Sequence, residues 1–337
     1  MVKVGIIANP ISARDIRRVI SHAGNLPIND RANIVLRMMT GLAAAGVDEV
    51  VVMPENGGIR FHLERIIGRE LRLGHSGLPR LRYLDMPVTA SAQDSATAAE
   101  MMAAEAVAAI VVLGGDGTNR VVVGACGSVP VAGVSTGTNN AFPELREPTI
   151  TGLAVGLAAS GRVPAATALR ANKWLEVRVN DRREIALVDV AVVEEHYVGA
   201  RAIWKAEGFR DLFVTFGLPQ AIGMSAIAGL CAPLDRDAPQ GRHIRLSPRA
   251  SRWLAAPIAP GLIERVGIAG VEVMQPGARH VPSIAQGALA FDGERELTFG
   301  PGDRVSVRLV PDAFHTIDVP ACMAHAAQEG LFLCNPD

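Results

Sequence analysis

Apolar runs and amphipathic stretches alternate along the first half of the chain. The apolar runs lack the every-second-residue polar positions of a half-exposed strand, which predicts strands buried on both faces of a parallel sheet. The expected strands are Val2–Ala8, Glu49–Met53, Leu81–Leu84, Val107–Leu113 and Val129–Val134. Helices are expected between them, beginning at Asp15–Val19 and then at Ala32–Ala45, Phe61–Leu71, Ala92–Glu105 and Asn119–Ala125.

The pattern changes after about Pro148. One more helix, Gly152–Ala159, precedes β-rich stretches separated by turn signals such as Asn180-Asp181 and Pro301-Gly302-Asp303. These stretches are Trp174–Val179, Ile185–Val193, His243–Leu246, Val271–Met274, Ala288–Phe291 and Arg304–Val310. The chain is therefore predicted to be an α/β protein: a doubly wound, Rossmann-like domain at 1–148, a β-rich, sandwich-like domain at 149–312, and a C-terminal segment at 313–337 that packs back on the first domain.

The composition changes this picture little. Of 337 residues, 49% are hydrophobic and 20% are charged, and the formal net charge is -1. This balance of charges disfavours a polybasic mode of nucleic-acid binding, which needs an excess of basic residues to neutralise many phosphates at once. The four cysteines, at positions 126, 231, 322 and 334, form no C-x-x-C pair, and the N-terminus lacks the features of a signal peptide, so we expect a reduced, cytoplasmic protein.

One long uncharged stretch, Leu212–Leu234, invites comparison with a membrane span. Pro219, Gln220 and several glycines interrupt it, so we interpret it as a buried or subunit-interface segment. The histidines of the β-rich part, His196, His243 and His280, show no metal-ligand spacing in the sequence, and we interpret each of them as structural, with no metal site expected.

The most informative motif follows an apolar strand directly. Gly114-Gly115-Asp116-Gly117-Thr118 stands between the strand Val107–Leu113 and the next helix. Glycines allow the backbone to come close to a bulky anion, and the first amides of a helix favour phosphate oxygens. A carboxylate at Asp116 would repel phosphate unless it handles a proton or a metal, which makes it a candidate chemical residue. The alternative is a tight turn in which Asp116 caps the helix.

Two further polar loops follow predicted strands. Ser135–Phe142 comes after the strand Val129–Val134 and presents hydroxyl and amide groups, and Asn9-Pro10-Ile11-Ser12 comes after the first strand. Ligands of open α/β sheets bind at the carboxyl ends of strands, so the three loops are expected to face one crevice. Neither a P-loop nor a G-x-G-x-x-G fingerprint is present to account for them.

These motifs carry a resemblance to a known family. Gly114–Thr118, Asn9-Pro10-x-Ser12, Gly137-Thr138-Asn139-Asn140 and a late Asp292-Gly293-Glu294 together resemble the superfamily of NAD kinases, diacylglycerol kinases and sphingosine kinases. The start of the chain at 7–15 and the helix entry at 93–95 look most like its AcoX branch, the ATP-NAD kinase-like proteins associated with acetoin catabolism. The resemblance covers most of the chain, from residue 3 to about 310.

The resemblance implies an activity and a set of site residues. It implies a kinase that uses ATP and Mg²⁺ to phosphorylate a hydroxyl of NAD or a related nucleotide-like acceptor, in a homo-oligomer, a dimer or tetramer, with no membrane span. Asp116 would act as base or hold the metal, and Glu294 would act near the acceptor hydroxyl unless Asp292-Gly293 is only a hairpin turn. The residues expected to bind nucleotide are Asn9, Ser12, Gly114, Gly115, Gly117, Thr118, Asn119, Thr138, Asn139, Asn140 and Asp189.

Two departures from the family pattern bear on which acceptor the protein uses. Lipid kinases carry an Asp where this chain has Ala141, which weakens the lipid-kinase alternative. NAD kinases carry an Asn-Glu pair that holds the acceptor's ribose, and the local match here is Val188-Asp189, which counts against NAD itself as acceptor. A nucleotide-sensing regulator that has lost turnover is therefore a third hypothesis.

Overall fold

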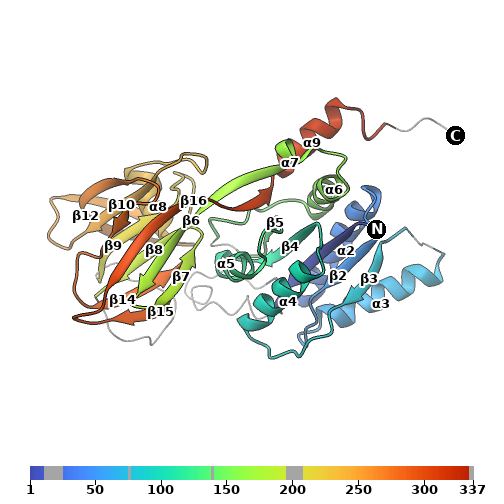
Figure 1. The fold of residues 1–337 in the computed structure, drawn as a ribbon, viewed down its shortest axis with the longest axis horizontal. Helices are drawn as coiled ribbons and strands as arrows, with labels where there is room; N and C mark the ends of the chain where they lie inside the picture. The colour runs from blue at the N-terminus through green and yellow to red at the C-terminus, as the bar shows by residue number, and fades with distance from the viewer. Residues whose placement is uncertain (11–25, 75–76, 138–139, 195–207, 334–337) are drawn as a thin grey trace.

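The computed structural model describes residues 1–10, 26–74, 77–137, 140–194 and 208–333, and Figure 1 shows their fold. The first part of the chain forms five parallel strands in the spatial order β3-β2-β1-β4-β5. The strands are β1 (Lys3–Ala8), β2 (Glu49–Val52), β3 (Arg80–Tyr83), β4 (Ala109–Gly114) and β5 (Val131–Ser135). The parallel sheet predicted from the apolar runs is confirmed.

Helices cover both faces of this parallel sheet. Val4 and Ile6 of β1 point into one apolar cluster with α2, α3, α6 and α9, whereas Ile7 points into another with α4 and α5. Burial on both faces explains why the strands show no polar alternation. The helices of this part are α2 (Ile28–Ala44), α3 (Ile59–Arg72), α4 (Ala92–Ala104), α5 (Asp116–Ala125) and α6 (Pro148–Ala159).

Local signals in the sequence set some of these helix starts. Ser91 caps α4: its hydroxyl accepts from the Gln93 N–H, and the Asp94 carboxylate accepts from the Ser91 N–H to complete a capping box. Glu147 caps α6 by accepting from the Ile150 N–H. The helix expected at Asp15–Val19 lies outside the described residues.

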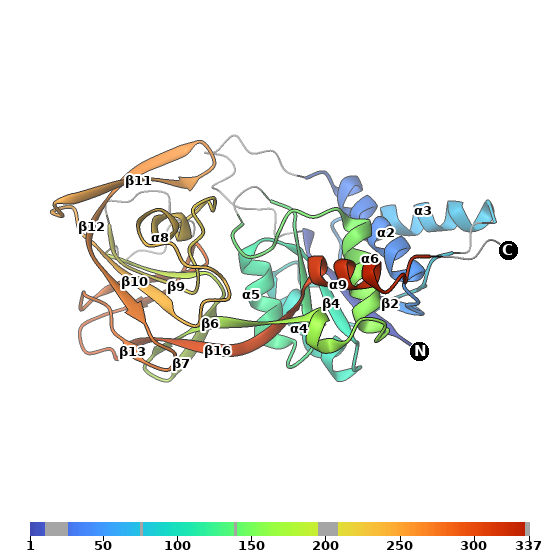
Figure 2. The same cartoon turned by 90° about the horizontal axis from the view of Figure 1, so that it is seen from above.

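Residues beyond 148 extend the parallel sheet. After the short helix α7 (Ala165–Ala168), strand β6 (Leu169–Val179) pairs along its length with β16 (Val305–Ile317), and Thr316 of β16 lies beside Val131 of β5. Strands β7 (Arg182–Ala186) and β13 (Arg279–His280) flank this pair. The β6–β16 pair therefore runs from the parallel sheet into the β-rich part, as Figure 2 shows.

A second, antiparallel sheet builds most of the β-rich part. Its order is β11-β12-β10-β9-β8-β14-β15, and it packs on β6, β7 and β16 through an apolar cluster that includes Phe213, Phe291 and Leu309. The sandwich-like architecture predicted for this part is confirmed. Its strands are β8 (Asp189–Val193), β9 (Phe209–Val214), β10 (Gly241–Leu246), β11 (Arg252–Ala259), β12 (Leu262–Met274), β14 (Gly287–Phe291) and β15 (Glu294–Phe299).

The uncharged stretch Leu212–Leu234 is largely interior to this chain. It supplies the end of β9 and all of α8 (Ser225–Cys231), and Ile227 and Ala228 of α8 are fully buried on the outer face of the second sheet. Among the described helices, none is long and apolar enough to cross a membrane. The C-terminal helix α9 (Val319–Gln328), capped by Asp318, packs against α6 and α7 of the first part.

The stretch Ile185–Val193 is two strands, not one β segment. Ala186 ends β7 in the first sheet, and Asp189 begins β8 in the second. The carboxylate of Asp292, in the β14–β15 turn, accepts hydrogen bonds from the N–H groups of Leu187, Val188 and Asp189. These bonds satisfy the backbone where the chain crosses between the sheets, a tertiary effect that the local sequence does not reveal.

Candidate functional site

The glycine loop stands at the end of β4 and the beginning of α5, as predicted. Its three glycines have different surroundings. A Cβ atom at Gly114 would meet the Thr118 side chain at 2.6 Å, and one at Gly115 would meet Asn140 Oδ1 at 2.6 Å. A Cβ atom at Gly117 would meet, among the described atoms, only Glu294 Oε1, at 3.9 Å. Packing therefore requires the first two glycines, and Gly117 borders open space.

The Asp116 carboxylate holds the loop that follows β5. Its oxygens accept from the N–H of Ala141 at 3.0 Å and from the N–H of Phe142 at 2.8 Å. The N-cap of α5 is Gly115, without a side-chain capping bond. The alternative interpretation, that Asp116 caps its own helix, is therefore wrong, and the carboxylate joins the first and second loops.

The second loop is further ordered by its own polar groups. Asn140 donates from Nδ2 to Ser135 Oγ at 2.8 Å, and that hydroxyl donates to the Gly137 carbonyl. Because Asn140 also lies against Gly115, the two loops are packed together at the carboxyl ends of β4 and β5. Thr138 and Asn139, which were predicted to bind nucleotide, lie outside the described residues.

Asn9 and Asn119, two of the residues expected to bind nucleotide, form side-chain hydrogen bonds within the protein. Asn9, at the end of β1, is buried and donates from Nδ2 to the Ser91 carbonyl at 2.9 Å and to Ser95 Oγ at 3.1 Å. Asn119 is also buried, and its Nδ2 donates to the Gly115 carbonyl at 2.9 Å. Both side chains thus fix the loops around the crevice. Ser12 lies outside the described residues.

The β14–β15 turn reaches the glycine loop from the β-rich part. Asp292 and Gly293 have φ angles of 50° and 86°, the left-handed backbone of a two-residue hairpin turn, so the turn predicted there is present. The turn brings Glu294 beside Gly117. Asp292 is buried and lies 3.7 Å from Nε of Arg120 on α5, an ion pair between the two parts of the chain. Burial raises the pKa of Asp292, and Arg120 opposes that effect.

Arg236 is a residue of this region that the sequence did not single out. Its guanidinium donates to the carbonyl oxygens of Ala141, at 2.9 Å, and Phe142, and it lies over the rings of Phe142 and Phe216. Burial lowers the pKa of Arg236 to about 10, so the side chain is still a cation at neutral pH. Arg236 lies about a hundred residues away in a loop without a motif, and no signal in the sequence places it here.

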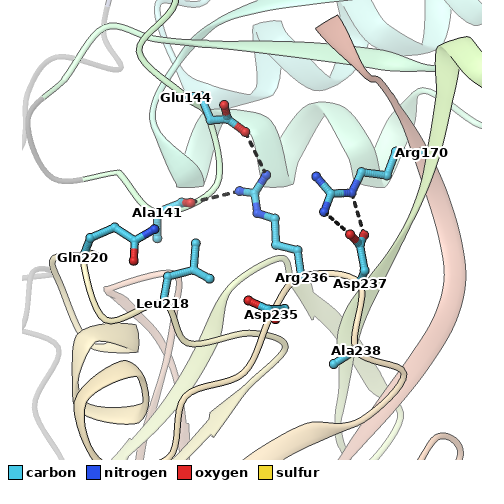
Figure 3. A pocket seen from close by; sticks show the side chains of 9 residues that line it. All are labelled: Ala141, Glu144, Arg170, Leu218, Gln220, Asp235, Arg236, Asp237 and Ala238. Atoms are coloured by element: carbon cyan, nitrogen blue, oxygen red, sulfur yellow. Dashed lines mark hydrogen bonds and ion pairs between the residues drawn. The ribbon is translucent and has the colours of Figure 1, made fainter. Parts of the chain in front are cut away.

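A cavity of about 760 Å³ opens beside Arg236, between the second loop and the β-rich part. Figure 3 shows the nine residues that line it: Ala141, Glu144, Arg170, Leu218, Gln220, Asp235, Arg236, Asp237 and Ala238. Arg170 makes a two-pronged ion pair with Asp237, at 2.7 and 2.6 Å, and Arg236 lies 3.8 Å from Glu144. The lining carries three carboxylates and two arginines beside apolar residues, Ala141, Leu218 and Ala238.

Comparison with known proteins agrees with this two-part arrangement. Residues 4–163 match the family described as ATP-NAD kinase N-terminal domain, and residues 173–312 match the Acetoin catabolism protein X C-terminal domain. The chain is also 52% identical, over 99% of its length and 94% of the relative's, to "Acetoin catabolism protein X" of Cupriavidus necator. The chain belongs to the acetoin catabolism protein X family. The resemblance to the AcoX branch of the NAD kinase-like proteins is thereby confirmed.

In this member of the acetoin catabolism protein X family, Val188 does not line the crevice. Its side chain is 1% exposed, in the apolar cluster that also holds Leu187, Phe216 and Phe314. Asp189 is also buried, at 4% exposure. Val188, the local match to the Asn that the resemblance implies, is therefore part of the core.

Proposed function

We propose that this protein is an ATP-dependent phosphotransferase whose acceptor is a hydroxyl of NAD or of a related nucleotide-like compound. The observation that carries the proposal is the Asp116 carboxylate bonded to the Ala141–Phe142 backbone, because Ala141 also lines the 760 Å³ cavity. Asp116 thus lies between a glycine loop suited to phosphate and a cavity suited to an acceptor. The NAD kinase N-terminal domain match at 4–163 supports the same reaction class.

The glycine loop fits the phosphates of ATP. Open space lies where a Cβ atom of residue 117 would stand. Gly117 and Thr118 lie in the first turn of α5, whose amides favour an anion. When bound, ATP with Mg²⁺ would supply the phosphoryl group and neutralise its charge. Glu294 Oε1, beside Gly117, is a hard oxygen donor of the kind that Mg²⁺ accepts, and we assign it to the metal or to the acceptor hydroxyl.

The cavity lining fits an acceptor that offers hydroxyl and amide groups. Carboxylates such as Asp235 and Glu144 can accept from ribose hydroxyls, and Gln220 offers both a donor and an acceptor. A lipid kinase needs an apolar channel for acyl chains, whereas Leu218 and two alanines are the apolar members of this lining. The cavity therefore favours a nucleotide-like acceptor over a lipid.

We assign Asp116 the role of proton acceptor for the acceptor hydroxyl. Besides accepting from the Ala141 and Phe142 N–H groups, this carboxylate stands among glycines that we assign to phosphate, where a negative charge would repel the ligand unless it takes part in the reaction. Asp116→Asn keeps an oxygen for one of the two backbone N–H groups but removes the negative charge. Positioned general-base catalysis contributes roughly 10²–10⁴-fold, so we expect kcat to fall by that factor while ATP affinity stays level or improves.

The test measures turnover and ATP Kd for wild type and Asp116→Asn, with NAD, NADH, NADP and a short-chain diacylglycerol as acceptors and Mg²⁺ present. Asp85→Asn is the matched control, because Asp85 is an exposed carboxylate after β3. Near wild-type kcat in Asp116→Asn would refute the proton-acceptor role. A rate with diacylglycerol alone would favour the lipid kinase.

A nucleotide-sensing regulator is the second candidate, favoured by the burial of Val188. That side chain cannot hold a ribose, so the family's acceptor contact is missing at this position. A sensor would bind ATP, seen as a rise in Tm, and would show no turnover with any of the four acceptors. Phosphoryl transfer to any of them excludes the sensor.

A further inference from the structure

Two histidines of the β-rich part come together far from the glycine loop in the sequence. His243 of β10 and His280 of β13 have ring centroids 5.8 Å apart, with their planes at 75°. His243 lies opposite Glu272 in the register of β10 and β12, and its Nδ1 is 3.8 Å from Glu272 Oε2. One ligand atom of each of the three side chains lies within 4.8 Å of the other two.

One ring nitrogen of each histidine has no hydrogen-bond partner among the described residues. His243 is 5% exposed, and its Nδ1 is a buried atom without a partner among the described residues. The same holds for His280 Nε2. A buried polar atom without a partner is costly, so these two nitrogens favour a ligand bound between the histidines. A cation bound between the two nitrogens would satisfy both.

The remaining nitrogen of His243 is fixed as it is in metal sites. His243 Nε2 lies 2.8 Å from Asp211 Oδ1, and the other oxygen of that buried carboxylate accepts from the N–H and hydroxyl of Ser283 at 2.8 and 2.7 Å. A carboxylate that accepts from one ring nitrogen leaves the lone pair of the other free for a metal. Phe213 stacks on the imidazole at 4.2 Å and holds its plane.

We propose that His243 Nδ1, His280 Nε2 and Glu272 form a binding site for a zinc-type divalent metal ion. Two imidazoles and one carboxylate are ligands that Zn²⁺ takes readily, with water completing the tetrahedron. Glu272 is half exposed; Arg245 pairs with its Oε1 at 2.9 Å, and its Oε2 is the oxygen that lies 3.8 Å from His243 Nδ1. The ion would join β10 and β12 of the second sheet to β13, which pairs with β16 of the first (Figure 2).

Metal content and affinity test this site without any activity assay. The full chain, stripped with a chelator, is titrated with Zn²⁺ against a competing indicator, and bound metal is counted by mass spectrometry. We expect one Zn²⁺ per chain for wild type and a rise in Tm on binding. His280→Gln and Glu272→Gln, both at partly exposed positions, should weaken binding by roughly 100-fold or more. His315→Gln, an exposed histidine on β16, should bind like wild type.

Two further measurements distinguish this site from metal bound elsewhere on the chain. Asp211→Asn should keep the stoichiometry and weaken affinity by roughly 10–100-fold, the effect of a positioning residue on a metal ligand. Co²⁺ in place of Zn²⁺ should give visible d–d bands without sulfur charge transfer. The proposal is overturned if His280→Gln binds Zn²⁺ as tightly as wild type, if wild type binds none, or if sulfur bands place the metal on cysteines.

Discussion

At the scale of single residues, the Ala141–Phe142 backbone is held from two sides. Asp116 accepts from its N–H groups, and Arg236 donates to its carbonyl oxygens. The two side chains come from different parts of the chain, so the backbone beside the cavity is fixed only when both parts are folded together. We regard Arg236 as a positioning residue for this backbone.

Replacing Arg236 with Leu tests how firmly that backbone is held. Leucine keeps apolar contact with the Phe142 and Phe216 rings but leaves two carbonyl oxygens without their donor. The free energy of unfolding should fall by about 1–3 kcal/mol, measured by urea denaturation. Arg249→Leu, at an exposed position after β10, should change it little. Equal stability of the two variants would contradict the holding role of Arg236.

At the scale of elements, the start of α5 separates structural glycines from the one that borders open space. Gly114 and Gly115 are crowded by Thr118 and Asn140, whereas Gly117 has room for a methyl group. Sequence alone predicted the strand, the turn and the helix here but treated the three glycines alike, because their neighbours come from other loops.

Gly117→Ala should therefore stabilise the protein and weaken ATP binding. Alanine replaces glycine in the first turn of a helix, which raises stability by about 0.5–1 kcal/mol. Its methyl group occupies the space that we assign to phosphate, so the ATP Kd should rise about tenfold or more, equivalent to ~1.4 kcal/mol. Urea denaturation and calorimetric titration give the two values. An unchanged ATP Kd would show that the phosphates of ATP do not bind beside Gly117.

Strands β2 and β3 carry a pH-sensitive pairing. The Glu49 carboxylate is 1% exposed and lies 2.5 Å from Arg80 and 2.7 Å from Arg82, and these hydrogen bonds lower its pKa below the ordinary value. Between the lowered and the ordinary pKa, the unfolded chain binds more protons than the folded protein. The stability from this carboxylate is therefore complete above its ordinary pKa of 4.5 and decreases as the pH falls below that value.

The variant Glu49→Gln removes that contribution. As the pH falls from about 5 to about 3, wild-type stability should fall more steeply than that of Glu49→Gln, whereas Glu100→Gln, at an exposed position on α4, should follow wild type. Urea denaturation across this range provides the slopes. Parallel slopes for wild type and Glu49→Gln would show that the pairing contributes no pH dependence.

At the scale of the whole molecule, the β6–β16 pair and the β14–β15 turn are two of the connections that join the α/β and β-rich parts. The β6–β16 pair runs from one part into the other, and the Arg120–Asp292 ion pair links α5 to the β14–β15 turn. The same Asp292 carboxylate holds the crossing of the chain from β7 to β8. This turn thus controls both the crossing and the position of Glu294.

Replacing only Asp292 of the ion pair should lower the free energy of unfolding more than replacing both Asp292 and Arg120. Asp292→Asn leaves the guanidinium of Arg120, 8% exposed, without its carboxylate, and we expect the free energy of unfolding to fall by about 3–5 kcal/mol. The double variant Arg120→Met with Asp292→Asn removes the buried charge as well and should recover part of that loss. Urea denaturation compares the three proteins. A double variant no more stable than the single one would contradict the pairing.

The sequence by itself determined the parallel strands, the glycine loop after β4, the cap of α4, the turn at Asp292 and the family. Each of these depends on local preferences of the backbone or on apolar periodicity, which a few consecutive residues express. Only the tertiary structure decided that Asp116 holds the second loop, that Arg236 reaches the same backbone, that Val188 is buried, and that His243 and His280 converge. These contacts join residues far apart in the sequence, and burial sets their energies, so no local pattern encodes them.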